Sequence, residues 1–415
     1  MERVILHCDL NNFFASVSLL YNQTLLLEPV AVAGRVEDRH GIILAKNEIA
    51  KKYGVKTAEP IWEAKRKCPN LYILPPLYDK YEEFSLKARE IYLRYTDMVE
   101  PFGMDECWLD VTGSQLLFGS GEDIAEKIKN DIKNELGITA SVGVSFNKSF
   151  AKLGSDMKKP DGLTVISREN FKEKIYHLPI EDLLFVGKST KHSLNSKGIF
   201  TIGDLAVCDE NLLKKFLGKN GVSLKKCAMG LDDTPVLAPK ESDTPKSISR
   251  SRTRSNDLTD MNDVWSELML YGEEIAEKLR SYDVYAFTVT VSVRDTALQF
   301  KEYSTKITGG TQTGITLARE ALKLFIENAP LPCRSIGLRA SGLKQSQGAF
   351  QTDMFSDAES EEKERRIEEE ISNICSRFGE NKLTRGVLLN KVKNYSPGHS
   401  LPSYVTRKDN KKKEV

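Results

Sequence analysis

Residues 4–17 read VILHCDLNNFFASV and residues 103–110 read GMDECWLD, and these two stretches decide what kind of fold the chain can form. In the first, Asp9 closes an apolar run of β-strand character; in the second, Asp105 and Glu106 are adjacent. A carboxylate at the end of a buried strand is costly to desolvate unless a cation or hydrogen bonds compensate it. Folded together, the two stretches would give the three-acid cluster that two Mg²⁺ ions need, with substrate phosphates completing their coordination.

Each acid also has an ordinary structural interpretation. Taken singly, Asp9 is a helix N-cap, and Asp105 with Glu106 is a solvated turn. Asp110 is expected to be structural, closing a turn before Gly113. The metal interpretation is favoured because both sequence contexts occur in one chain.

Composition bounds the class of protein. A chain of 415 residues is too long for one ordinary core, so roughly two to four domains are expected. The 60 basic and 59 acidic residues give a net charge of +1, so any nucleic-acid surface must be local. Seven scattered cysteines without zinc-site spacing indicate reduced thiols. Without a signal-peptide core or a bilayer-length apolar stretch, a soluble, cytoplasmic protein is expected.

Changes in composition and hydrophobic period divide the chain into five parts. They are a mixed α/β domain (1–168), a helical domain (169–236), a linker (237–245), a second α/β domain (246–343) and a polar tail (344–415). Among the clearest local patterns are helices at 121–136 and 314–328 and an alternating strand at 287–293.

The helical part contains two glycine turns. Residues 183–188 (LLFVGK) and 194–199 (LNSKGI) have the helix–glycine–helix pattern of a helix-hairpin-helix. We expect Gly187, Lys188 and Gly198 to contact DNA, because glycine N–H groups can approach a phosphate closely.

The two opening stretches resemble the metal-binding motifs of the Y-family translesion DNA polymerases, in particular the DinB-like (DNA polymerase IV) branch. The shared features are an Asp followed by two aromatics and Ala-x-Val, then Asp-Glu-x-x-Leu-Asp, and the resemblance covers roughly residues 1–343. It implies a multidomain α/β and α+β fold of the right-hand polymerase kind. The parts would be a palm with small fingers inserted at about residues 21–74, a helical thumb and a little-finger domain.

The resemblance also implies a chemistry. Asp9, Asp105, Glu106 and the backbone carbonyl of Leu10 would bind two Mg²⁺ ions for nucleotidyl transfer. Phe14 aligns with the steric gate, whose ring excludes a ribose 2′-OH.

Further residues are implied to contact the nucleotide. Phe13 would lie under the base or sugar, although an aromatic pair after a strand is usually core. Tyr81 and Lys159 match positions that touch phosphates. Lys51 stands where many members carry arginine, and it offers a charge without the bidentate fork. Glu48 replaces an aromatic residue and brings an acid towards a polyanion, so modest nucleotide affinity is expected.

Residues 246–255 (KSISRSRTRS) carry four cations and no acid. Arginines at every second position share one face of a strand, which suits a phosphate backbone; a disordered basic linker is the alternative. The expected DNA contacts in this segment and in a later strand are Lys246, Arg250, Arg252, Arg254, Arg334 and Arg339.

Residues 351–355 (QTDMF) resemble the sliding-clamp-binding peptide of bacterial polymerases. Gln351, Met354 and Phe355 would be its contact residues, although so loose a pattern also arises by chance. The predicted helix at 361–378 and residues 385–392 have no assigned role.

The preferred function is a template-directed, error-prone DNA polymerase that performs translesion synthesis without proofreading. It would act as a monomer on primer-template DNA and deoxynucleoside triphosphates. One alternative is a catalytically idle accessory protein that binds DNA and the clamp, supported by the unusual fingers residues. Another is a two-metal nucleotidyl transferase or cyclase on a related palm, which would need neither the helix-hairpin-helix nor the basic strand.

Overall fold

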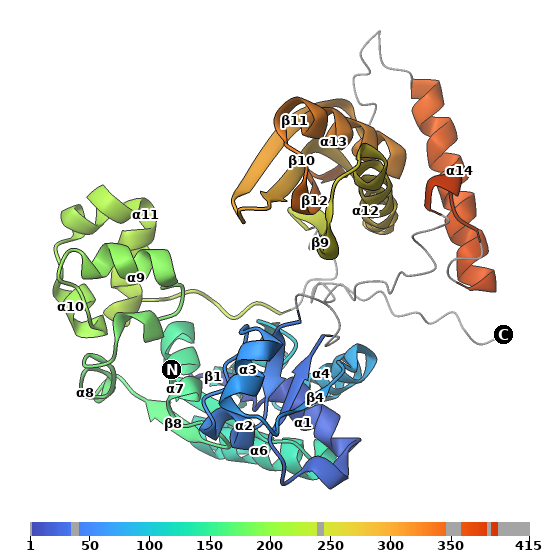
Figure 1. The fold of residues 1–415 in the computed structure, drawn as a ribbon. Coiled ribbons are helices and arrows are strands. Elements are labelled where there is room, and N and C mark those ends of the chain that lie inside the picture. Colours follow the sequence, from blue (N-terminus) through green and yellow to red (C-terminus); the bar gives the residue numbers. More distant parts are fainter. Residues whose placement is uncertain (1, 35–40, 239–244, 346–357, 380–382, 389–415) are drawn as a thin grey trace. The chain divides into compact units, whose positions relative to one another are not determined.

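The computed structural model describes residues 2–34, 41–238, 245–345, 358–379 and 383–388 (Figure 1). The chain divides into two compact units, with the boundary between Glu241 and Ser242. This boundary lies inside the segment 237–245 that the sequence predicts to be a linker. No helix in the described ranges is both long and apolar enough to cross a membrane.

The first unit is built on a five-stranded sheet with the order β5-β6-β1-β7-β8. The strands are β1 (Ile5–Leu10), β5 (Val99–Pro101), β6 (Glu106–Asp110), β7 (Ala140–Ser145) and β8 (Leu163–Ile166). β1 is central, pairs antiparallel with β6 and β7, and is buried along its whole length. A strand that is covered on both faces needs a nearly continuous apolar run, which explains the composition of the first stretch.

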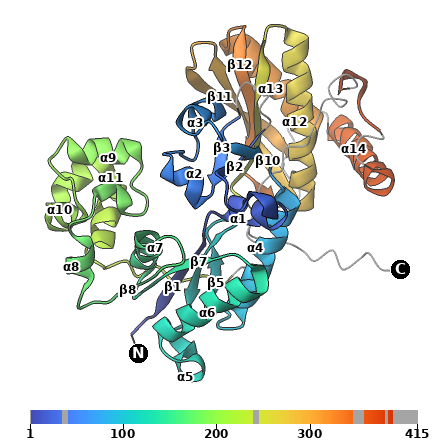
Figure 2. The same ribbon diagram turned by 60° about the horizontal axis from the view of Figure 1, so that its bottom comes forward.

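Helices cover both faces of this sheet (Figure 2). The larger ones are α1 (Phe13–Leu20), α4 (Tyr78–Leu93), α6 (Gly121–Leu136) and α7 (Lys148–Met157), with shorter η1 (Gln23–Leu25), η2 (Thr112–Ser114) and α5 (Gln115–Phe118). The first three share a core with Leu6, Cys8 and Leu10 of β1. The predicted helix at 121–136 is confirmed: a capping box at Ser120 starts it and left-handed Gly137 ends it.

Helix α7 packs on the opposite face of the sheet, which receives the alternate side chains of β1. A Cβ at Gly143 in β7 would lie 2.0 Å from the carbonyl oxygen of Ala151 in α7. Glycine at this position therefore lets the helix backbone rest directly on the sheet. This close approach brings the α7 side chains to the level of Asp9.

A smaller lobe is inserted between α1 and α4. It has a three-stranded sheet, order β3-β2-β4, of β2 (Val30–Ala33), β3 (Ile43–Lys46) and β4 (Tyr72–Leu74). Helices α2 (Glu48–Lys52) and α3 (Ile61–Lys67) complete it. Its buried core is separate and small, centred on Ile43, Ala50 and Ala64.

The remainder of the first unit is helical. It comprises α8 (Phe171–Ile175), η3 (Ile180–Asp182), α9 (Lys188–Asn195), α10 (Ile202–Val207) and α11 (Glu210–Ala228). Gly187 is the N-cap of α9, and Gly198 (φ 78°) makes the turn between α9 and α10. These helices, with Phe146, Phe150 and Ile166, form a third core cluster.

The second unit is an antiparallel sheet, order β11-β10-β12-β9, covered on one face by two helices. Its elements are β9 (Ser247–Leu258), α12 (Met261–Ser281), β10 (Val284–Asp295), β11 (Phe300–Thr311), α13 (Gly314–Asn328) and β12 (Cys333–Ser341). The predicted strand at 287–293 and helix at 314–328 are both confirmed. Val289, Val291 and Val293 point into the core, as their alternation requires.

This unit continues past residue 343, where the sequence predicts a polar tail. Strand β13 (Lys344–Gln345) pairs with β10, and α14 (Ala358–Phe378) and η4 (Gly386–Leu388) follow. Glu368 of α14 accepts hydrogen bonds from the backbone N–H groups of Gly314 (2.9 Å) and Ile315 (3.3 Å) at the start of α13. Leu388 is buried in the core of the unit. The second unit therefore extends beyond residue 343, because a strand pairing, a carboxylate that accepts from a distant backbone and a buried leucine tie the later residues to it.

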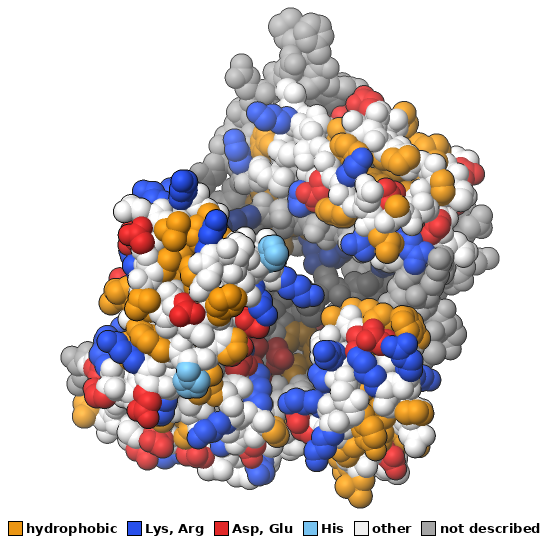
Figure 3. Space-filling model, turned by 60° about the vertical axis from the view of Figure 1, so that its left-hand side comes forward, with side chains coloured by type: hydrophobic (Ala, Val, Ile, Leu, Met, Phe, Trp, Pro, Cys, Tyr) orange, Lys and Arg blue, Asp and Glu red, His pale blue; other side chains and the backbone are white. Residues whose placement is uncertain are grey.

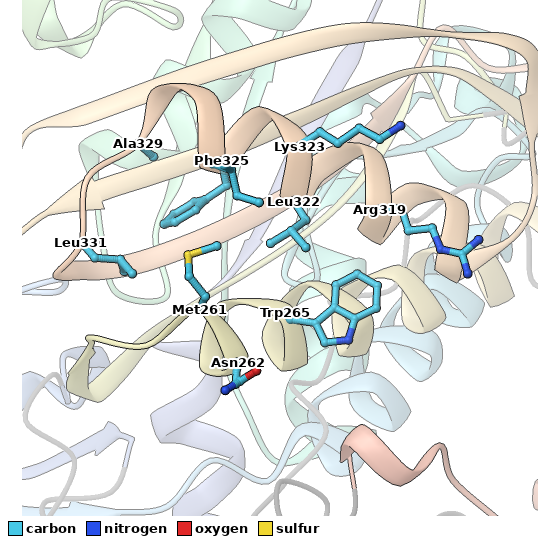
Figure 4. Close-up of a pocket in the computed structure, with 10 residues that line it drawn as sticks. Met261, Asn262, Trp265, Arg319, Leu322, Lys323, Phe325, Ala329 and Leu331 are labelled. Atoms are coloured by element: carbon cyan, nitrogen blue, oxygen red, sulfur yellow. The ribbon is translucent and has the colours of Figure 1, made fainter.

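A pocket of about 770 Å³ lies between α12 and α13 of the second unit (Figure 4). Its lining is largely apolar, with Asn262, Arg319 and Lys323 as the polar members. None of the residues that the sequence singles out for chemistry lines this pocket.

Candidate active site

The register of β1 and β6 brings the three acids together. Asp9 lies directly opposite Glu106, and the backbone N–H of Leu10 donates to the carbonyl of Asp105 at 2.9 Å. Because Leu6, Cys8 and Leu10 point into the core, Asp9 points to the other face of the sheet, towards α7. Asp9 is only 4% exposed. It is part of the strand, so the helix N-cap interpretation of Asp9 is wrong.

Two lysines of the α7 segment contact this cluster. Lys152 Nζ lies 3.3 Å from Asp9 Oδ2 and 3.1 Å from Glu106 Oε1. Lys159 Nζ lies 2.6 Å from Asp9 Oδ2 and 2.8 Å from Asp156. The structure thus places Lys159 at the site, as the sequence predicts, but on an acid. Lys152 was not predicted as a site residue; the signal was its place four residues after Lys148, on the helix face that rests on the sheet.

Burial and these charges shift the pKa values of the acids in different directions. Burial raises the pKa of Asp9 to about 7 despite the two lysines. Burial and the charge of Glu106 raise the pKa of Asp105 to about 6. Burial also acts to raise the pKa of Glu106, but its hydrogen bond to His7 and the charge of Lys152 outweigh that and lower it to about 2. The cluster therefore favours any cation that compensates its buried carboxylates better than lysine does.

The donor set fits a divalent, oxygen-preferring ion. Three carboxylates and a strand-end carbonyl are ligands that Mg²⁺ accepts, and it usually takes only a few from protein. Across the described ranges, no three His, Cys, Asp or Glu side chains are already arranged to hold a metal ion. Lys152 and Lys159 instead satisfy the carboxylates. Metal binding thus means exchange of ammonium contacts for metal contacts.

Phe14 and Tyr81 form one stacked pair. Their ring centroids are 4.2 Å apart with an interplanar angle of 9°. Phe14 is half-buried, whereas Tyr81 is 0% exposed and its hydroxyl lies 2.7 Å from Ser18 Oγ. The prediction that Tyr81 touches a phosphate is therefore corrected: its hydroxyl is used inside the protein, and its ring backs Phe14.

Phe13 also differs from its predicted role. It is 3% exposed and belongs to the core shared by α1, α4 and the sheet. Successive residues of a helix point about 100° apart. One ring of the pair therefore enters the core while the other lines its edge, and Phe13 has no surface for a base or sugar.

In the fingers, Glu48 is paired on two sides. The side-chain amide of Asn12 donates to Glu48 Oε1 at 3.0 Å, and Lys51 Nζ lies 3.4 Å from the same oxygen. Asn12 has left-handed backbone geometry (φ 47°), which asparagine tolerates well. These partners offset the charge of Glu48.

The alternating arginines of β9 share one face, as predicted, but that face turns towards α12. Arg250 Nε lies 2.6 Å from Glu274, and Arg254 lies 3.2 Å from buried Glu267. Arg252 is 3.9 Å from Glu274. The expected open phosphate-binding ladder is therefore wrong. Alternation along the strand places the three arginines on one face of β9, and the acids of α12 hold that face against the helix.

The other face of β9 carries hydroxyls. Ser249, Ser251 and Thr253 are exposed, and the register places Arg339 of β12 directly opposite Ser249. Arg339 pairs with Glu302 at 3.0 Å, both side chains being 38% exposed. In contrast, Arg334 is largely buried and lies 3.1 Å from Asp257, while Lys246 is exposed.

The glycine turns of the helical region are open. A Cβ at Gly187 or Gly198 would meet nothing within 4 Å, so another molecule can reach the backbone there. Lys188 follows as the first residue of α9.

On the molecular face in Figure 3, basic and acidic side chains are interspersed, in keeping with the near-neutral net charge. The clamp-like residues Gln351, Met354 and Phe355 lie outside the described residues.

Comparisons with known proteins agree with this arrangement. The profile of the impB/mucB/samB family matches residues 8–156, and that of the same family's C-terminal domain matches residues 245–354. A DNA polymerase IV of Acetivibrio thermocellus is 48% identical over 94% of this chain and 98% of its own length. DNA polymerase IV 1 of Bacillus subtilis is 34% identical over 96% of each chain.

Among solved structures, a Y-family DNA polymerase chimera of Dbh and Dpo4 superimposes with a TM-score of 0.74 at 26% identity. The match covers 82% of this chain and 99% of the chimera. The five-stranded unit with its three acids is thus the palm, the inserted lobe the fingers, the helical region the thumb and the second unit the little finger. The chain belongs to the impB/mucB/samB family of Y-family DNA polymerases, in the DNA polymerase IV branch.

Proposed function

We propose that Asp9, Asp105, Glu106 and the backbone carbonyl of Leu10 hold two Mg²⁺ ions for nucleotidyl transfer. The chain is a template-directed, error-prone DNA polymerase that performs translesion synthesis without proofreading. The observation that supports this metal site most directly is the β1–β6 register, which sets Asp9 opposite Glu106 next to Asp105. The idle accessory function has no support, since all three acids are present and adjacent.

The residues around the acids have distinct tasks in this proposal. When bound, the divalent ions lower the pKa of the primer 3′-OH and neutralise the triphosphate. Without metal, burial favours the protonated forms of Asp9 and Asp105, and both carboxyl groups lose their protons when the ions bind. Lys159, in the turn after α7, exchanges Asp9 for a phosphate of the nucleotide, and Lys51 adds charge from the fingers. Lys152, which contacts Asp9 and Glu106, likewise exchanges carboxylate contacts when the ions bind.

Phe14 is proposed as the steric gate. It excludes ribonucleotides by the volume of its ring, so the ring must keep its position when a 2′-OH approaches it. The parallel stack on fully buried Tyr81 supplies a rigid backing. Phe14 would thus exclude the 2′-OH with help from a residue that never meets the nucleotide.

DNA is proposed to contact the thumb and the little finger through open surfaces. In the thumb these are Gly187, Lys188 and Gly198, whose backbone is accessible. In the little finger, Lys246, Arg339 and the hydroxyls beside it replace the inward arginines as candidates. Such contacts bind the DNA phosphate backbone and position the duplex without distinguishing base sequence.

Gln351, Met354 and Phe355 are proposed to bind a sliding clamp, which would offset low processivity. We further propose that the protein works as a cytoplasmic monomer on primer-template DNA with deoxynucleoside triphosphates.

Primer extension tests the proposed site. Wild type should extend a primer with Mg²⁺ according to the template base, and the double variant Asp105→Ala/Glu106→Ala should not. Glu122→Ala, an exposed acid in the first turn of α6, is the matched control and should retain activity. Extension by the double variant at the wild-type rate would refute the metal site.

A further inference from the structure

Phe185 of the thumb has a backbone conformation that its side chain disfavours. The backbone N–H of Val186 donates to the carbonyl of Leu183 at 3.1 Å, which closes a four-residue turn with Phe185 in its third position. The φ angle of Phe185 is 69°, as a type II turn requires at this position, which glycine or asparagine normally fills. Within the described ranges, Phe185 is the only aromatic residue with a positive φ. A bulky residue in this region is a conformational outlier and lowers stability.

The packing of the thumb does not explain this conformation. Leu183 and Val186, at the two ends of the turn, are buried in the thumb core, whereas Phe185 is 71% exposed. A single exposed apolar residue is ordinary, but this one is kept at a position where a smaller residue would fit better. Because the buried ends fix the turn, the ring is held outside the thumb. Residues under such strain are concentrated at functional sites.

The ring lies beside the proposed phosphate contacts of the thumb. Phe185 is two residues before Gly187, so their Cα atoms are at most about 7 Å apart. A Cβ at Gly187 would meet nothing within 4 Å, and the next residue, Lys188, is exposed. The other open glycine has a similar neighbour, since Phe200, two residues after Gly198, is 57% exposed. Each open glycine of the thumb therefore has an apolar ring next to it.

An apolar ring and a phosphate contact fit neighbouring groups of one DNA strand. Every phosphate of the strand is bonded to a deoxyribose, which presents carbon-bound hydrogens rather than charge. A phosphate at Gly187 and Lys188 would bring such a sugar within reach of Phe185. The apolar surface that the ring lacks in the free protein is thus available on the DNA backbone.

We infer that Phe185 packs on a deoxyribose of the primer-template, next to the phosphate at Gly187 and Lys188. The inference rests on the proposed DNA contact of the thumb, and it adds an apolar contact to those charged and backbone groups. A ring on a sugar binds every base sequence alike and releases no counterion. In a chain with a net charge of only +1, Phe185 supplies affinity that salt does not screen.

The salt dependence of DNA binding tests this contact. Fluorescence anisotropy measures the affinity of the full chain for a labelled primer-template over a series of salt concentrations. We expect Phe185→Asn to bind about 5- to 10-fold more weakly at every concentration, with the salt slope of wild type. Lys188→Ala should weaken binding and lower the slope by about one ion. Val207→Ala, at a comparably exposed residue at the end of α10, is the matched control and should bind as wild type does.

Thermal stability gives a second readout of opposite sign. Asparagine tolerates a positive φ, so Phe185→Asn should raise the unfolding temperature of the first unit by a few degrees while it weakens DNA binding. Phe185→Tyr keeps both the ring and its strained backbone, so its stability and DNA affinity should stay near those of wild type. Calorimetry without DNA measures the unfolding temperatures. A residue that served only the fold would not show this opposition.

The outcomes separate this inference from the proposed function. If Phe185→Asn binds DNA as wild type does while Lys188→Ala binds more weakly, the thumb contacts DNA but the ring does not. If both variants bind as wild type does, the proposed thumb contact is wrong and the inference with it.

Two further results would overturn the role of Phe185. A lowered salt slope in Phe185→Asn would mean that the ring acts through the phosphate contacts, and a lowered unfolding temperature would mean that the turn is not strained. Should Phe185→Asn fail to fold, Phe185→Gly, which also accepts this φ, replaces it in both measurements.

Discussion

Two buried carboxylate clusters, one in the palm and one in the little finger, solve the same electrostatic problem in different ways. In the little finger, Glu368 accepts bonds from two backbone N–H groups at the start of α13 and pairs with Arg280 (2.8 Å) and Arg385 (3.2 Å). In the palm, Asp9 is compensated by the ammonium groups of Lys152 and Lys159. Fixed amides and planar guanidinium groups hold a carboxylate permanently, whereas lysines on flexible stems can be exchanged.

The surroundings of the two acids agree with this difference. Glu368 complements the positive end of a helix whose N-cap, Thr313, makes no side-chain capping bond of its own. Asp9 lies at a strand end where burial raises its pKa. A satisfied buried acid stabilises a fold, and an imperfectly satisfied one is available for chemistry.

Removing the palm acids should give the largest effect on function and little on folding. We expect Asp105→Ala/Glu106→Ala to lower the extension rate by at least about 1,000-fold, since metal-bound charge stabilisation contributes several kcal/mol. Its thermal unfolding temperature without metal should stay near that of wild type, since removing Asp105, whose pKa burial raises, offsets the loss of the Glu106–Lys152 pair. Single-turnover extension and calorimetry measure the two, and a destabilised but active variant would contradict the contrast.

Removing the little-finger acid should do the reverse. Glu368→Ala leaves Arg280 and Arg385 without their buried partner, so we expect the second unit to lose about 3 kcal/mol of unfolding free energy. Nucleotide incorporation per folded molecule should change little. Denaturant unfolding followed by tryptophan fluorescence tests this, with exposed Glu370→Gln as the control. Equal stability of both variants would show that α14 does not hold the unit together.

The stability of the metal-free protein should depend on pH through the buried acids of the palm. The pKa values of Asp9 and Asp105 are raised to about 7 and 6, so between pH 5 and 8 folded molecules retain protons that unfolded ones lose. Unfolding free energy should therefore fall as pH rises through this range, on the order of 4 kcal/mol. Calorimetry with and without Mn²⁺ measures it, and the ion should restore most of the loss at pH 8. Stability that rises with pH would contradict the assignment.

Substitutions of the stacked residues Phe14 and Tyr81 should have different effects, because only Phe14 is proposed to contact the nucleotide. We expect Phe14→Ala to admit ribonucleotides at least about tenfold better relative to deoxyribonucleotides, because an occupied volume is emptied. Tyr81→Phe keeps the stack and loses the bond to Ser18, so discrimination and nucleotide KM should stay near wild type. A raised KM in Tyr81→Phe would restore a phosphate role for that hydroxyl.

The smallest effects are expected on the little-finger sheet. Arg339→Ala should weaken primer-template binding modestly and reduce its salt slope by about one ion. Arg250→Ala should affect the stability of the second unit more than DNA binding, since Arg250 pairs with Glu274. Fluorescence anisotropy of a labelled primer-template, measured over a series of salt concentrations, compares the DNA affinities of the two variants. A larger DNA-binding defect in Arg250→Ala would mean that the inward arginines turn out to meet DNA.

Much of the fold was readable from local patterns. The helix at residues 121–136 has its isoleucines four apart and its capping Ser120 and Gly137 next to it in the chain, so its bounds were predicted correctly. The acids at 9, 105 and 106 were predicted as a site because Asp9 ends an apolar strand and Asp105 and Glu106 open a second one, where burial of a carboxylate needs compensation. The helix is encoded within a few residues, whereas the interpretation of the acids needed two sequence contexts in one chain.

The other features depend on what a residue meets across the fold. Alternation put the β9 arginines on one face, but Glu274 and Glu267 of α12 decided that it is the inner one. Likewise, the hydroxyl of Tyr81 met Ser18, and Lys152 and His7 joined the acids through the close approach of α7 to the sheet. Periodicity in a sequence records which side chains share a face. The partner on that face comes from a distant segment, and so it emerges only when the chain is packed.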